Sequence, residues 1–192
     1  MMKKIFCGIL IFFGFQGCKS PDNQNAKEST KSLSLPYFGE IVIEPTRDYD
    51  TVIKLEDYSI SSDLNFYEEV VDCETLSMVE LILNDLPTFI NKSKEILITD
   101  FKKGGAVKDY IEHHLEVMEK SELERLLVNA DKNESAEKQL LSFMKVVRIG
   151  FYPDEDSHYA IFDFSIGTDE TDYRITIRYN NTGNFDSLEF VS

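Results

Sequence analysis

The sequence has one short run of side chains suited to catalysis or metal binding, Glu112-His113-His114. Histidine and glutamate act as general acids and bases and as metal ligands. On a helix, however, adjacent histidines point in different directions, and this run is not the His-Glu-x-x-His zinc motif. A hydrolytic or metal-dependent site built on Glu112 and His113 would therefore need a residue from elsewhere, for which His158 is the candidate.

The alternative interpretation of this run is structural. The helical period places His114 beside Ile111, on the apolar side of the helix. There we expect a partly buried histidine whose ring is satisfied by a hydrogen bond. His113 would face solvent and pair with Asp109 or Glu116. We favour this interpretation, and we expect neither a metal nor a cofactor.

Two acidic loops, residues 154–156 and 169–172, raise a calcium hypothesis. A predicted strand over residues 158–166 separates them, and at about 3.3 Å per residue it places them at opposite ends of a sheet. Neither loop has the ligand spacing of an EF-hand. We therefore predict solvated hairpin tips. Asp163 lies within the same strand, and alternation directs it away from its apolar neighbours.

Other enzyme signatures are absent from the sequence. There is no Gly-x-Ser-x-Gly nucleophile motif, no phosphate-binding glycine loop and no paired-cysteine metal site. Cys73 is interpreted as a small apolar residue near a helix start rather than as a nucleophile or redox switch. The sequence therefore favours a protein without enzymatic activity.

The first 18 residues indicate export and lipid attachment. Lys3 and Lys4 precede a short apolar run over residues 5–15, and Gly17 stands before Cys18. The run is shorter than the roughly 20 residues of a membrane-spanning helix. Ordinary secretory cleavage fits less well, because Phe15 occupies a position that prefers a small residue.

Residues 15–18, Phe-Gln-Gly-Cys, resemble the lipobox of bacterial lipoproteins. The resemblance implies a signal peptide over residues 1–17, cleavage between Gly17 and Cys18, and diacylglycerol on Cys18. Two acyl chains suffice for stable anchoring. We therefore expect a lipoprotein of the bacterial cell envelope that meets the membrane through Cys18.

After Cys18 the chain divides into a tether and a domain. Residues 18–34 are rich in polar side chains and predict a disordered tether, whereas residues 35–192 have the composition and length of one globular domain. The chain carries 35 acidic and 20 basic residues, a net charge of −15. This charge disfavours nucleic acid as a partner. Solubility is the favoured explanation of the acidity, and a site for a basic envelope protein is the alternative. The oligomeric state is not indicated.

Hydrophobic periodicity predicts an α+β fold with helices inserted between two groups of strands. The helices would pack on one face of a mostly antiparallel sheet of about six or seven strands. Pro87 is expected to kink or split the first helix, Ser121 to begin a capping box, and Ser135 to cap the last helix. The predicted strands cover residues 37–44, 53–56, 59–66, 145–152, 158–166, 173–180 and 188–191, and the helices 76–90, 94–103, 107–120, a short one from 121, and 135–143.

Several segments, taken in order, resemble one bacterial family. They are residues 35–41, 110–115, 147–154, 160–167 and 171–173, which read LPYFGEI, YIEHHL, VRIGFYPD, AIFDFSIG and TDY. The family is the domain-of-unknown-function family numbered two thousand and four. The resemblance implies a domain that elsewhere commonly occurs as a soluble protein, and it brings no established activity and no site residues.

Three functional hypotheses follow. The first is a membrane-tethered, non-enzymatic binding module whose acidic surface engages a basic envelope protein, for example an immunity-like protein that neutralises a toxin. The second is an envelope hydrolase or metal-dependent enzyme using Glu112, His113 and His158. The third is a structural component of the envelope.

Overall fold

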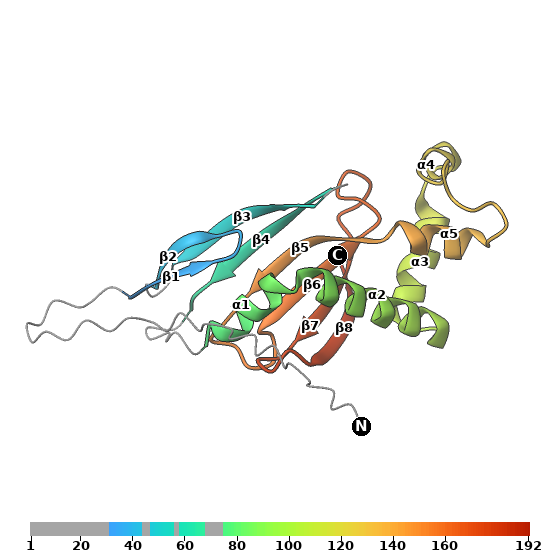
Figure 1. Ribbon diagram of the computed structural model, residues 1–192. Helices are drawn as coiled ribbons and strands as arrows, with labels where there is room; N and C mark the ends of the chain where they lie inside the picture. The colour runs from blue at the N-terminus through green and yellow to red at the C-terminus, as the bar shows by residue number, and fades with distance from the viewer. Residues whose placement is uncertain (1–30, 44–46, 56–57, 68–74) are drawn as a thin grey trace, which may run out of the picture.

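The computed structural model describes residues 31–43, 47–55, 58–67 and 75–192 (Figure 1). The predicted leader, Cys18, the tether up to residue 30 and Cys73 lie outside these ranges. Within the ranges, no helix is both long enough and apolar enough to span a membrane.

Six strands form the main sheet in the order β3-β4-β5-β6-β7-β8. All neighbours pair antiparallel except β4 and β5, which are parallel. Parallel neighbours need a crossover connection, and here the crossover contains all five helices of the described chain. The predicted α+β class, with inserted helices, is confirmed. The strands are β3 (Asp48–Lys54), β4 (Ser59–Asn65), β5 (Lys145–Phe151), β6 (Ala160–Ser165), β7 (Arg174–Tyr179) and β8 (Phe185–Val191).

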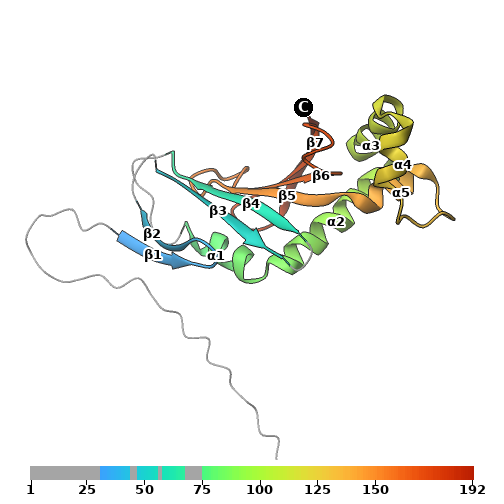
Figure 2. The ribbon, with the colours of Figure 1, turned by 90° about the horizontal axis from the view of Figure 1, so that it is seen from above.

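The helices are α1 (Ser77–Asn84), α2 (Leu86–Lys103), α3 (Ala106–Val117), α4 (Lys120–Leu126) and α5 (Ala136–Phe143). Seen from above, α1 lies on the same side of the sheet as a separate two-stranded hairpin, β1 (Lys31–Leu35) and β2 (Gly39–Ile43) (Figure 2). The helix α2 continues from α1 along the sheet, and α3 contacts β7 and β8.

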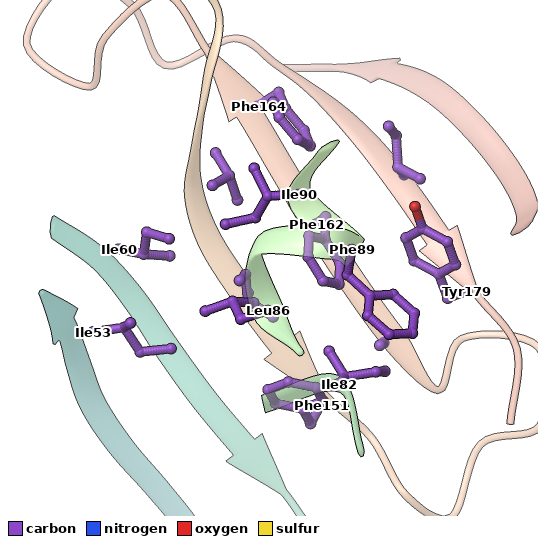
Figure 3. Packing of buried hydrophobic residues seen from close by; sticks show 14 of the residues in the cluster. Ile53, Ile60, Ile82, Leu86, Phe89, Ile90, Phe151, Phe162, Phe164 and Tyr179 are labelled. Atoms are coloured by element: carbon purple, nitrogen blue, oxygen red, sulfur yellow. The ribbon is translucent and has the colours of Figure 1, made fainter. Parts of the chain in front are cut away.

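The core lies between the sheet and the first two helices (Figure 3). Alternation turns one side chain in two toward the helices, among them Ile60 on β4 and Phe162 on β6, both fully buried. From the helices, Ile82 and Leu86 meet them, also fully buried. Each such side chain contributes about 1.5–3 kcal/mol through removal from water. Among the described elements, no helix covers the opposite face of the sheet (Figure 2).

The β1–β2 hairpin corrects the predicted start of the domain. A tether was expected up to residue 34 and a single strand over residues 37–44, but Lys31–Leu35 pairs antiparallel with Gly39–Ile43. Tyr37 and Gly39 adopt positive φ angles of 66° and 74°, which allow the tight turn. The hairpin is held by Leu35 and Ile41, which are buried in the core.

The helix predicted over residues 76–90 is split as expected, although two residues before Pro87. The break between α1 and α2 falls at Asp85, and Pro87 occupies the first turn of α2, where its missing N–H breaks no helical hydrogen bond. The separate helix expected over residues 94–103 is therefore the second half of α2. Gly104, at φ 72°, ends α2 as predicted.

Only one of the two predicted side-chain caps is present. The Ser135 hydroxyl accepts a hydrogen bond from the Lys138 backbone N–H, which confirms this cap. The Ser121 capping box is wrong, because α4 already begins at Lys120, after Glu119, and has no side-chain cap.

Candidate functional site

The sheet face turned away from the helices carries a row of polar side chains. Arg148 on β5 pairs in register with Asp163 on β6, and Asp163 pairs with Thr176 on β7. Asp63 on β4 belongs to the same face, because the parallel pairing of β4 with β5 brings it beside Arg148. Four strands therefore contribute to one polar network.

Arg148 is the centre of this network. Its Nε and Nη2 donate to the two carboxylate oxygens of Asp63, each at 2.7 Å, and its Nη1 donates to Asp163 Oδ2 at 3.0 Å. Nη2 also donates to the Tyr152 hydroxyl at 2.7 Å. Partial burial works to lower the pKa of Arg148, but hydrogen bonds with Asp63 and Tyr152 outweigh it and raise the pKa above its usual value. The guanidinium thus holds β4, β5 and β6 together as a permanent cation.

Asp163 lies beneath this cation and is only 3% exposed. Its Oδ1 accepts a hydrogen bond from the Thr176 hydroxyl at 2.7 Å, and Arg174 Nη1 lies 3.6 Å from Oδ2. The structure confirms that Asp163 points away from its apolar neighbours, and that face is the one turned away from the helices. Buried carboxylates persist in proteins when they are paired and hydrogen-bonded, as this one is. The network is therefore internally satisfied and offers no unpaired acid or base for catalysis.

A pair of stacked tyrosines, half-buried Tyr152 and exposed Tyr67, extends this network to the surface. The rings of Tyr67 and Tyr152 stack with centroids 5.8 Å apart and an interplanar angle of 21°, and Tyr67 is 60% exposed. The backbone N–H of Tyr67 donates to Asp154 Oδ2 at 2.7 Å. Desolvation, the neighbouring Tyr152 and the carboxylates of Asp48, Asp154 and Asp63 all raise the pKa of Tyr67. We call Tyr67, Tyr152, Asp48, Asp63 and Asp154 the tyrosine–carboxylate patch.

The chemistry of this patch suits recognition of a cation. Aromatic ring faces attract ammonium and guanidinium groups, and nearby carboxylates complement them. Arg148 neutralises Asp63, and Asp48 supplies a further negative charge beside Tyr67. Within the described part of the chain, the side-chain partners of the two tyrosines are each other, the Asp154 carboxylate and the Arg148 guanidinium.

The structure does not bring Glu112, His113 and His158 together. Glu112 forms an ion pair of 3.3 Å with Lys108 on the surface of α3. The helix α3 meets the far end of β6, where Tyr110 approaches Ser165, whereas His158 precedes the first residue of that strand. The length of β6 therefore separates His158 from the other two residues.

His113 and His114 both lie against protein, in different surroundings. His113 is half-buried against the rings of Tyr173 and Phe190, with centroids 4.8 and 5.9 Å away. The prediction of a solvent-facing pair with an acidic residue was therefore wrong, because α3 packs on β7 and β8. His114 is buried, with Nδ1 2.7 Å from the Tyr110 carbonyl, so the prediction of a hydrogen-bonded structural histidine is confirmed.

The two acidic loops are engaged by other side chains. Arg125 Nη2 donates to both carboxylate oxygens of Glu170, each at 2.8 Å. At the other end of β6, Asp156 accepts a hydrogen bond from Asn181. Across residues 31–43, 47–55, 58–67 and 75–192, no three His, Cys, Asp or Glu side chains are grouped so that they could hold a metal ion.

Sequence patterns did not reveal the tyrosine–carboxylate patch. Asp48 begins β3 and Tyr67 comes shortly after the end of β4. Nothing in their local spacing distinguishes them from other surface residues. Their proximity to Tyr152 depends on the pairing of β4 with β5 across more than 80 intervening residues.

In comparisons with known proteins, no family model, no curated protein and no solved structure matches the chain. The functional proposal therefore rests on the residues and contacts of this chain.

Proposed function

We propose that the protein is a non-enzymatic binding module of the bacterial envelope, anchored through lipid on Cys18, that engages a basic protein partner. Neutralisation of a basic toxin by an immunity-like protein is one form of this function. The observation that carries the proposal is the tyrosine–carboxylate patch on the helix-free face of the sheet. Membership of the domain-of-unknown-function family numbered two thousand and four is part of the same proposal and rests on the resembling segments.

The charges and the exposure of the patch support a protein partner. Tyrosines are enriched where proteins bind, because one residue supplies both a large ring and a hydroxyl. Here Tyr67 is largely exposed, and Asp48 lies on β3, the edge strand of the sheet. Lysine and arginine side chains of a partner can therefore approach both the ring and the carboxylate from solvent. The net charge of −15 adds long-range attraction for such a partner.

The binding proposal predicts that changing the charge of the patch weakens binding of the captured basic protein. Full-length protein is crosslinked in intact envelopes and captured, and the recovered basic protein is then titrated against variants. With Asp48→Lys combined with Tyr67→Ala, we expect its affinity to fall at least about tenfold at low salt, because a like charge replaces an attractive one and a stacking surface is lost. Added salt should weaken wild-type binding.

Asp186→Lys is the matched control for this experiment. Asp186 is exposed on β8, at the opposite edge of the sheet, so the same change of charge occurs outside the patch. The control should bind nearly as well as the wild type. Recovery of no reproducible partner, or equal losses in the two variants, would contradict the proposal.

The anchoring proposal is tested by intact mass. Mature protein isolated from membranes should begin at Cys18 and carry the added mass of diacylglycerol, because the apolar run and Gly17 direct processing to that cysteine. Cys18→Ala should abolish the added mass and release the domain from the membrane, since the acyl chains supply the binding energy. A wild-type mass without acyl groups would contradict lipidation without bearing on the patch.

A further inference from the structure

We propose that the pocket between α2 and α5 binds a single-chain anionic amphiphile, in which a carboxylate or phosphate is carried on an aliphatic chain. The pocket has a volume of about 430 Å³. Figures 1 and 2 both show α5 beside the C-terminal part of α2. Small-molecule pockets in proteins typically measure about 300–1,000 Å³, so a ligand of this class fits the range.

The floor of the pocket is apolar. One wall is a stripe on α2 in which Leu97, Ile98 and Phe101 follow one another at helical spacing. The opposite wall includes Leu141 of α5 and Met144, which directly follows that helix. Ile98 remains 42% exposed although it lines this pocket. An aliphatic chain seated here would remove that surface from water, which is the main source of affinity for such a ligand.

The rim of the pocket is basic, in contrast to the acidic protein as a whole. Lys94 and Lys102 flank the apolar stripe on α2, and Lys138 lies opposite on α5. Glu134 is the only acidic residue among those lining the pocket, and it already pairs with Lys138 at 2.8 Å. Among the described residues, no carboxylate lies within 4.0 Å of Lys94 or Lys102. These two ammonium groups are therefore available to an anionic head group while the chain lies on the stripe.

The pocket is separate from the tyrosine–carboxylate patch. Met144 immediately precedes β5, whereas Tyr152 immediately follows it. A strand of this length spans roughly 23 Å at about 3.3 Å per residue. Binding at the pocket and binding at the patch can therefore succeed or fail independently.

Photolabelling of the full chain tests the proposal. The protein, kept in amphipol, is irradiated with a photoreactive dodecanoate, and the labelled peptides are mapped by mass spectrometry. We expect labels on the α2 stripe and on residues 141–144. Unlabelled dodecanoate or dodecyl phosphate should compete, and the stronger of the two identifies the preferred head group. Dodecyltrimethylammonium has a similar chain but a positive charge, so it should compete poorly.

Lys102→Glu and Lys103→Glu form a matched pair of variants. Both residues are exposed in the last turn of α2, so both changes have a similar cost at the helix end, but only Lys102 lines this pocket. Lys103 lines the neighbouring pocket between α2 and β8. We expect labelling to fall at least about tenfold in Lys102→Glu and to change little in Lys103→Glu. Equal losses, equal competition by the cationic amphiphile, or labels confined to other segments would overturn the proposal.

Discussion

Replacing Arg148 with methionine is expected to lower the free energy of unfolding by about 3–5 kcal/mol, the usual cost of leaving a buried charge without its partner. Asp163 would keep the Thr176 hydroxyl and the more distant Arg174 but lose the 3.0 Å contact with Arg148. Asp63 would lose a bidentate partner at the same time. The chain has no tryptophan, so urea unfolding is best followed by circular dichroism.

Arg125→Met provides the control for this prediction. Arg125 also holds a carboxylate through paired hydrogen bonds, those to Glu170, but its side chain is 64% exposed where that of Arg148 is 28% exposed. Water and salt screen the exposed pair, so we expect a much smaller loss of stability in Arg125→Met. If the free energy of unfolding fell equally in the two variants, burial of the Arg148 ion pairs would not be the cause of the loss.

A second substitution separates charge from packing. In the Arg148→Met background, Asp163→Asn removes the buried charge while the amide oxygen can still accept from Thr176. The double variant should therefore be more stable than Arg148→Met alone, because coupled residues do not contribute additively. If the double variant were no more stable than Arg148→Met, the loss of stability would come from packing of the Arg148 side chain and not from the unpaired charge of Asp163.

The sequence predicted the elements whose signal is local. Alternation over residues 145–152 and 158–166 predicted β5 and β6, and short connections predicted the hairpins. The β1 strand was missed because Ser32 and Ser34 give residues 31–34 the composition of a linker. What orders this strand is a distant contact, the burial of Leu35 against the core, and such a contact has no local pattern.

The candidate site depended even more on distant contacts. Alternation alone placed Asp163 on the face opposite its apolar neighbours but did not tell which face the helices cover. Its burial comes from Arg148, Arg174 and Thr176 on neighbouring strands. Asp63 and Arg148 are 85 residues apart and meet only because the chain crosses over through five helices before returning to β4. The sequence does not reveal which strand receives such a crossover.

His114 leads to the second prediction with a large effect, a loss of stability in mild acid. The Tyr110 carbonyl can only accept, so His114 Nδ1 carries the proton and Nε2, 3.0 Å from Thr171 Oγ1, accepts from that hydroxyl. Burial lowers the pKa of His114 below 6.5; the Tyr110 hydrogen bond opposes this shift, and His113 adds slightly to it.

Because the folded pKa of His114 lies below the unfolded value, the unfolded chain binds the proton more readily once the pH falls below about 6.5. His114 therefore contributes no penalty above that pH, and its destabilising effect grows as the pH falls toward the folded pKa. One proton corresponds to a slope of at most about 1.4 kcal/mol of unfolding free energy per pH unit.

Urea unfolding between pH 7 and pH 5 should show this loss of stability in the wild type. The control is His158→Gln, which replaces an exposed histidine and should keep the wild-type slope. In His114→Gln the side chain cannot take up a proton, so the slope should become shallower by the same amount. An unchanged slope in His114→Gln would assign the acid sensitivity to groups other than the histidine that joins α3 to the loop before β7.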